Sequence, residues 1–89
     1  MSNTSWLQNI LDNMNTIALI FPDHPSYSEK RAVREYFNAI PFLIPCSQYR
    51  TIFDTIIFQT SPIDPHVSNR TTLCEWVLKV TDEINKAFL

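Results

Sequence analysis

Hydrophobic side chains recur every three or four positions along the first part of the chain. Between residues 5 and 21 this spacing joins eight side chains: Trp6, Leu7, Ile10, Leu11, Met14, Ile17, Ala18 and Phe21. Residues spaced in this way share one face of an amphipathic helix. Because Pro22 cannot continue a helix, the pattern predicts a first helix over residues 5–21.

The same periodicity continues in a second helix, which is predicted to start after Ser26. Ser26 and Glu29 have the spacing of a capping box, in which the two side chains satisfy free N–H groups at a helix start. The apolar positions of this helix are Ala32, Val33, Tyr36, Phe37 and Ile40. We expect Pro41 to end it, because proline removes a backbone hydrogen bond and clashes with the preceding turn.

A third helix is predicted from Pro45, which suits the first helical position because it has no N–H to leave unsatisfied. At about 100° per residue, one stripe of this helix contains Cys46, Tyr49, Ile52, Phe53, Ile56 and Ile57. Tyr49 is therefore expected to point inward. The β-branched run over residues 55–57 would also suit a strand, so helix and strand remain alternatives there.

A fourth helix is expected after a loop over residues 60–68, with Ser68 or Thr72 as its cap. Its core face comprises Leu73, Trp76, Val77, Val80, Ile84 and Phe88. Cys74 falls at the flank of that face, where a half-buried small residue is expected, although its thiol could also reach a neighbouring helix or a partner subunit. Four helices with short, proline-containing connections predict a single domain over residues 1–89, an all-α antiparallel four-helix bundle.

Composition narrows the classes of function. The 89 residues include no glycine, which removes every phosphate-binding loop that depends on glycine. The net charge is −2 and the one basic cluster is Lys30, Arg31 and Arg34, so we expect no nucleic-acid binding. No apolar segment approaches the roughly 20 residues that span a bilayer, and the N-terminus lacks a basic segment followed by an apolar one. We therefore expect an intracellular, soluble protein without a membrane span.

The candidate chemistry depends on Cys46. A thiol beside the first turn of a helix feels unpaired N–H groups and the positive end of the helix dipole, which favour a thiolate. A dithiol site would need a second cysteine three residues later, where this chain has Tyr49. A lone cysteine in apolar surroundings is more often a buried packing residue than a nucleophile. No metal site is expected, because His24 has no further histidine or cysteine at ligand spacing.

Several short motifs occur in a characteristic order along the chain. They are Ala18 with Phe21-Pro22, the pair Pro25-Ser26, the run Ile44-Pro45-Cys46, the segment Ser68-Asn69-Arg70 to Leu73-Cys74-Glu75-Trp76, and Ile84-Asn85. In this order and spacing the chain resembles the Erv/ALR family of FAD-linked sulfhydryl oxidases over nearly its whole length. The resemblance implies a helical bundle that binds FAD and oxidises dithiols.

The chain also departs from the family at positions that contact the flavin. These positions are occupied here by Leu11, Asn15, Tyr49 and the pair Thr81-Asp82. Leu11 and Asn15 stand where the family has a tryptophan and a histidine. Tyr49 replaces the thiol that passes electrons to the flavin, and Thr81-Asp82 replaces a His-Asn pair. Trp76 and Asn85 are retained and would contact FAD if it binds. Tyr49 could instead fill part of the vacated ring site with its own aromatic side chain.

Two main hypotheses follow from the resemblance. The first is a degenerate, inactive sulfhydryl-oxidase-like domain without a cofactor, which acts as a structural or protein-interaction module. Erv/ALR-like domains commonly form homodimers through their first two helices, and Trp6 and Ile10 could serve such a surface. The second is an FAD-dependent thiol oxidase in which Cys46 pairs with Cys74 or with a partner's thiol.

A third, weaker alternative is a helical adaptor unrelated to the family. For the first hypothesis, compact Erv/ALR-like domains without extensions resemble those of large DNA viruses, which implies a role in a virion or a viral factory.

Overall fold

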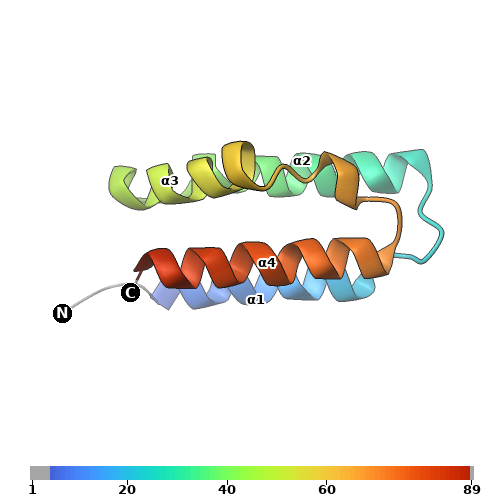
Figure 1. Ribbon diagram of the computed structural model, residues 1–89, viewed down its shortest axis with the longest axis horizontal. Coiled ribbons are helices and arrows are strands. Elements are labelled where there is room, and N and C mark those ends of the chain that lie inside the picture. Colours follow the sequence, from blue (N-terminus) through green and yellow to red (C-terminus); the bar gives the residue numbers. More distant parts are fainter. Residues whose placement is uncertain (1–4, 89) are drawn as a thin grey trace.

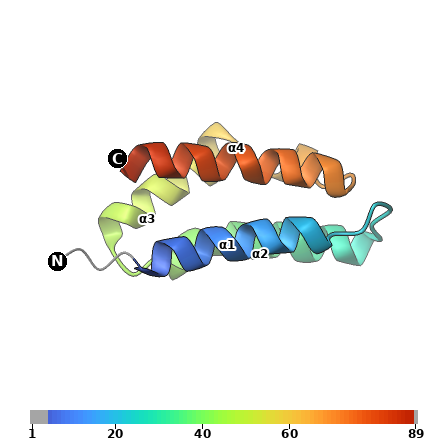
Figure 2. The same ribbon diagram turned by 90° about the horizontal axis from the view of Figure 1, so that it is seen from below.

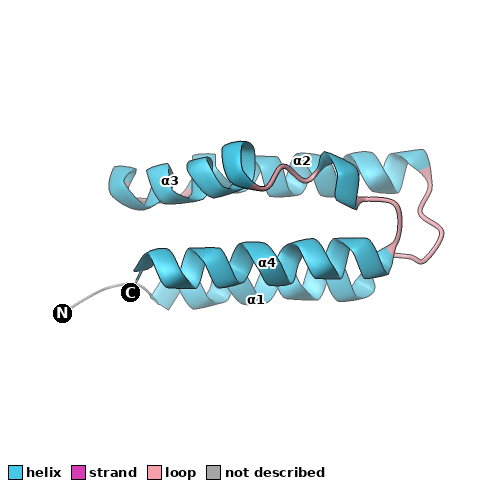
Figure 3. Cartoon of the chain, in the orientation of Figure 1, coloured by secondary structure: helices cyan, strands magenta, loops and turns pink. Residues whose placement is uncertain are grey.

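Four helices run up and down the long axis of the computed structural model, which describes residues 5–88 (Figure 1). They are α1 (Ser5–Ile20), α2 (Tyr27–Leu43), α3 (Ser47–Asp54) and α4 (Arg70–Phe88). A π-helix, η1 (Thr55–Thr60), continues α3, and a short 3₁₀ turn, η2 (Asp64–His66), precedes α4. Figure 3 shows helices and loops but no strand within residues 5–88, so residues 55–57 are helical rather than extended.

The helices form two layers of two. In Figure 1, α3 and α4 lie in front, with α2 behind α3 and α1 behind α4, and Figure 2 shows the same arrangement from below. Successive helices run in opposite directions, and α1 packs along α4. The predicted all-α antiparallel bundle is confirmed. At one end, which we call the Cys46 end, α1 and α3 begin and α2 and α4 end.

The core contains side chains from all four helices and from the loop before α4. Its buried members are Leu11, Met14, Ala18, Phe21, Val33, Phe37, Ile40, Ile44, Phe53, Ile56, Ile57, Ile63, Val67, Leu73, Trp76, Val77, Val80 and Ile84. Full burial of one large aliphatic or aromatic side chain stabilises a fold by about 1.5–3 kcal/mol. The core of α4 matches the predicted face, except that Phe88 is only partly buried.

Two helix starts are fixed by side-chain caps. Before α2, the Ser26 Oγ accepts a hydrogen bond from the Glu29 N–H (3.1 Å) and the Glu29 carboxylate accepts one from the Ser26 N–H (2.8 Å), so the predicted capping box is confirmed. Before α4, the Asn69 Oδ1 accepts from the Thr72 N–H (2.9 Å) and the Thr72 hydroxyl accepts from the Asn69 N–H (3.2 Å). The predicted cap at Ser68 or Thr72 was therefore wrong, because Asn69 holds that position.

The two prolines near the α2–α3 connection lie differently from the predictions. Pro41 does not end α2, which continues to Leu43. Pro41 removes one helical hydrogen bond, but the helix continues for only two residues beyond it, and the Ile44 N–H closes the helix by donating to the Pro41 carbonyl (3.4 Å). Pro45 is not the first residue of α3, since the helix begins at Ser47 with Cys46 as its N-cap.

The buried face of α2 is narrower than predicted. Ala32 and Tyr36 are exposed, whereas their neighbours Val33 and Phe37 are buried. The exposed face carries a row of apolar residues spaced by four, three and four positions, which we call the outer α2 row: Ala32, Tyr36, Ala39 and Leu43. This spacing is that of a helix seam that packs against another helix.

Candidate functional site

Cys46 is the N-cap of α3 and is exposed, with a free thiol. Its carbonyl accepts the first helical hydrogen bond, from the Arg50 N–H (2.8 Å), but its side chain makes no capping hydrogen bond. The expectation that this lone cysteine is a buried packing residue was wrong. The side chain does not join the buried stripe of α3, because the helix starts at Ser47, two residues later than predicted, and residue 46 has extended rather than helical backbone angles.

Cys74 lies in the second turn of α4, where it is half-buried against the core and has a free thiol. The half-buried position agrees with the prediction for this residue. The ring of Phe88, at the other end of α4, contacts Tyr49. At 1.5 Å per residue, the 14 residues from Cys74 to Phe88 span about 20 Å. Cys46 lies at the Phe88 end and Cys74 near the opposite one, too far apart for a disulfide.

Tyr49 points inward into a group of aromatic rings at the Cys46 end, as its helical phase predicted. Its ring centroid lies 4.7 Å from that of Phe88 and 5.6 Å from that of Trp6. Phe88 also lies 6.4 Å from Trp6 and 6.3 Å from Phe53. We call Trp6, Tyr49, Phe53 and Phe88 the aromatic cluster. It joins the start of α1, the whole of α3 and the end of α4.

Helical spacing places Trp6 and Phe88 on the apolar faces of two different helices and does not predict their contact with Tyr49. Trp6 had been considered for a dimer surface, but it is partly buried against the core and Tyr49. The antiparallel order of the helices was the available signal, because it places the start of α1, the start of α3 and the end of α4 at one end.

The remaining altered positions make contacts within their own helices. Leu11 is 3% exposed and belongs to the core, and the Asn15 Nδ2 donates to the Leu11 carbonyl (3.0 Å). Thr81 is 7% exposed, and its hydroxyl donates to the Val77 carbonyl (2.8 Å). The Asn15 amide and the Thr81 hydroxyl thus each donate a hydrogen bond to a carbonyl of their own helix.

The two retained positions do not face one another. Trp76 is buried, its indole N–H donates to the Ser61 carbonyl (2.7 Å), and its ring packs edge-to-face on Phe37 at 5.1 Å. Asn85 is exposed. Nine residues separate them, which at about 100° per residue places them on opposite sides of α4. Ser61 reaches Trp76 because the π-helix ends there, with the Ser61 N–H donating to the Ile56 carbonyl (2.9 Å).

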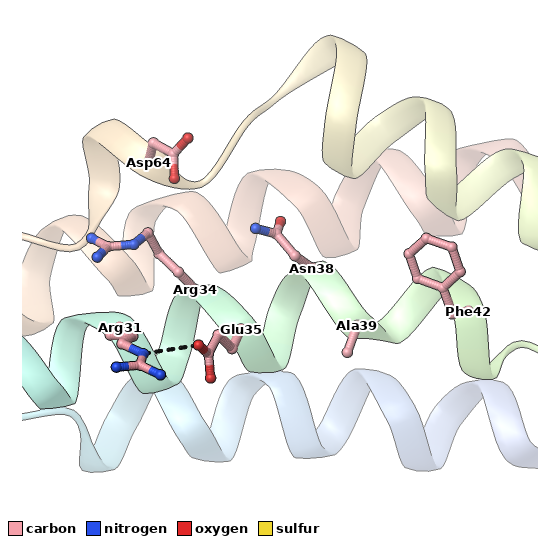
Figure 4. Close-up of a pocket in the computed structure, with 7 residues that line it drawn as sticks. All are labelled: Arg31, Arg34, Glu35, Asn38, Ala39, Phe42 and Asp64. Atoms are coloured by element: carbon pink, nitrogen blue, oxygen red, sulfur yellow. Dashed lines mark hydrogen bonds and ion pairs between the residues drawn. The ribbon is translucent and has the colours of Figure 1, made fainter.

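A shallow, open groove of about 680 Å³ lies between α2 and the segment that carries Asp64 (Figure 4). It is lined by Arg31, Arg34, Glu35, Asn38, Ala39, Phe42 and Asp64. Arg31 and Glu35 form an ion pair (3.0 Å) on the surface of α2. No cysteine and none of the altered positions lines this groove, which extends along α2 to Phe42, next to the last residue of that helix.

A model of the Erv1/Alr family matches residues 13–88 of the chain. The chain belongs to the Erv1/Alr family. The match includes all of α2, α3 and α4 and the second half of α1, which agrees with the order of motifs along the sequence. A search of curated proteins found no match.

The family is one of FAD-linked oxidases, so the fit of FAD to this Erv1/Alr chain can be tested on the residues present. Leu11 and Thr81 lie in a closed core, and the side chain of Tyr49 is covered by the rings of Trp6 and Phe88. These residues do not fit a flavin ring, and we derive no step through one.

Two other kinds of site can also be assessed within residues 5–88 of this Erv1/Alr domain. Among these residues, no three histidine, cysteine, aspartate or glutamate side chains gather as metal ligands. None of the helices in this range combines the length and the apolar character needed to cross a membrane.

Proposed function

We propose that this chain is an Erv1/Alr domain that does not run a sulfhydryl oxidase cycle and serves as a structural or protein-interaction module. The observation that carries the proposal is the position of Tyr49, which stands in the place of the second thiol and packs against Trp6 and Phe88. The bundle keeps its helical core while the residues that would carry electrons are replaced. Fold and activity are separable in this way.

The redox argument starts from the need for two thiols. A flavin sulfhydryl oxidase takes electrons from its substrate through a dithiol and passes them to the flavin. A tyrosine phenol cannot form a disulfide with Cys46, and Cys74 lies near the other end of the bundle. Within this chain Cys46 therefore has no resolving partner among residues 5–88, and the proposed role requires no flavin.

The surface proposed for interaction is the outward side of α1 and α2. An apolar groove there is lined by Ile17, Ile20, Phe21, Pro22, Glu29, Ala32 and Val33. The groove continues into the outer α2 row. Ile20, which lines the groove, is 70% exposed, and Leu43, the last residue of the row, is 73% exposed. Exposed apolar patches of this kind mark protein interfaces. We propose that a second copy of the chain covers this side, in line with the homodimers common among Erv/ALR-like domains.

The residues proposed from the sequence for this surface are revised accordingly. Trp6 is engaged in the aromatic cluster, and Ile10 is half-buried against the core, so neither carries the interface. Ala32 and Ala39 take this role because small residues allow a second helix to approach closely. The resemblance to compact domains of large DNA viruses suggests virion assembly as the setting.

The exposure of Cys46 favours one form of the oxidoreductase alternative. A free thiol on the surface can form a disulfide with a partner's thiol. Pairing with Cys74 is disfavoured because the two cysteines lie near opposite ends of the bundle. In that alternative the partner would supply the second thiol. The chain would then oxidise thiols only when the partner is present.

The test combines redox activity with oligomeric state. Purified protein is assayed for oxygen consumption with a reduced dithiol and added FAD, and its mass in solution is measured by light scattering. The proposal expects no thiol-dependent oxygen consumption and the mass of a dimer. Oxygen consumption above the rate with free FAD alone would establish the enzyme alternative. An inactive monomer that remains monomeric at high protein concentration would contradict the proposed self-association.

A further inference from the structure

We propose that the aromatic cluster takes the place of a flavin ring in this fold, so that the chain excludes FAD from the Cys46 end. This inference rests on the proposed absence of oxidase chemistry and deepens it. It concerns binding rather than turnover, since a chain without a dithiol could still hold an oxidised flavin. The cluster comprises Trp6, Tyr49, Phe53 and Phe88.

The first argument is one of space. Aromatic rings in contact have centroids about 4.5–7 Å apart, and the cluster pairs lie between 4.7 and 6.4 Å. A planar ring inserted between two others needs a carbon contact of about 3.5 Å on each side, which separates the outer rings by about 7 Å. Tyr49 and Phe88 are closer than that. A flavin could enter only if these two side chains moved apart.

The second argument concerns hydrogen bonds. The pyrimidine edge of an isoalloxazine carries carbonyl and N–H groups that need partners when they leave water. At the positions that correspond to flavin contacts, the Asn15 amide donates to the Leu11 carbonyl and the Thr81 hydroxyl to the Val77 carbonyl. Both donors are thus already engaged within the fold, and a ring bound there would compete with these bonds.

The third argument concerns charge. Asp82 is exposed on α4 and pairs with Lys86 at 3.0 Å, so its carboxylate stands beside the helix turn that leads to Phe88. An exposed carboxylate at this position disfavours the diphosphate of FAD, and Lys86 is already paired with it. Packing at the Cys46 end, together with hydrogen bonding and charge at the positions that correspond to flavin contacts, therefore opposes the cofactor.

The test measures FAD retention rather than activity. Wild-type protein and the Tyr49→Phe variant, which keeps the ring, are dialysed against FAD, and bound flavin is read from its visible absorbance. Both are expected to retain none. Tyr49→Ala, which removes the ring, is expected to bind FAD at least about tenfold more tightly than wild type. Phe42→Ala is the matched control, because Phe42 is an exposed aromatic residue outside the cluster.

Two results would overturn the inference. The first is retention of FAD by the wild type, and the second is equal exclusion of FAD by the wild type and by a folded Tyr49→Ala variant. Folding is checked by circular dichroism, and Phe88→Leu replaces Tyr49→Ala if that variant unfolds. FAD retention without oxygen consumption would overturn this inference and leave the proposed function standing. A wild-type protein that excludes FAD but never self-associates would leave this inference and contradict the proposed interface.

Discussion

The ring of Tyr49 lies 4.7 Å from the ring of Phe88, centroid to centroid, with the two planes inclined by 41°. Tyr49 belongs to the first turn of α3 and Phe88 is the last residue of α4, so the contact ties two helix ends that are distant in sequence. The position at which the family has its second thiol is thus part of the packing of the bundle. Substitutions of Tyr49 can distinguish the contribution of its ring to packing from the loss of the thiol that the family has at this position.

Replacing Tyr49 by alanine is expected to lower the free energy of unfolding by about 2 kcal/mol. The loss has two causes, the apolar area exposed and the ring contacts with Trp6 and Phe88. Tyr49→Phe retains these contacts and should change stability by less than about 0.5 kcal/mol. Urea denaturation followed by circular dichroism measures both variants. Equal stability of the alanine variant and wild type would show that the cluster does not hold the helix ends together.

Trp76 and Ser61 offer a second pair of matched variants. Trp76→Phe removes the donor to the buried Ser61 carbonyl and should cost about 2–4 kcal/mol, from the unsatisfied carbonyl and the smaller ring. The Ser61 hydroxyl is buried without a hydrogen-bond partner within the described part of the chain. Ser61→Ala keeps the carbonyl and removes this hydroxyl, so its stability should equal or exceed that of wild type. Thermal and denaturant unfolding distinguish the two; strong destabilisation by Ser61→Ala would indicate a partner for the hydroxyl.

The proposed interface is tested by a charge placed in the outer α2 row. Leu43→Glu puts a carboxylate at the end of the outer α2 row, inside the proposed contact, and should shift the protein to monomer, with at least about a tenfold rise in the dimer dissociation constant. Leu78→Glu is the control, since Leu78 is 65% exposed on α4, away from that row. Analytical ultracentrifugation over a range of protein concentrations gives both constants. The interface is misplaced if the Leu78 variant dissociates and the Leu43 variant does not.

Ionisation of Tyr36 makes the free energy of unfolding depend on pH in the alkaline range. Although Tyr36 is 37% exposed, the partial burial of its side chain raises its pKa above the ordinary value of 10.0, because desolvation disfavours the phenolate. The folded chain therefore keeps this proton where the unfolded chain has lost it. The contribution is complete below about pH 10 and is lost as the pH rises through the folded-state pKa. Tyr36→Phe cannot ionise, so it should lose less stability than wild type between about pH 9 and 11. Parallel losses in denaturant titrations would contradict this assignment.

Local periodicity predicted much of the fold because the burial of a helix face depends mainly on spacing along the chain. The residues of α4 from Leu73 to Ile84 meet the core as their spacing indicated. The same reasoning placed Tyr36 inside, where the structure exposes it. In α2 apolar residues occupy both faces, so the position of the neighbouring helices decides which of Tyr36 and Phe37 is covered.

The candidate site depended on features that spacing does not contain. The inward direction of Tyr49 followed from its helical phase, but its partners Trp6 and Phe88 come from opposite ends of the sequence. Only the packing of whole helices brings them together. The exposure of Cys46 depended on the start of α3 at Ser47 rather than Pro45, and a shift of this size lies within the usual uncertainty of helix ends.

The pairing of Trp6 with Phe88, at 6.4 Å between ring centroids, also determines where this domain can be joined to anything else. The described chain begins with α1 and finishes with α4 at the same end of the bundle, the Cys46 end (Figure 1). Any polypeptide fused before α1 and any fused after α4 would emerge as neighbours beside the aromatic rings. A linked protein at either boundary would therefore lie nearer to the Cys46 end than to the opposite end, where α1 ends and α4 begins.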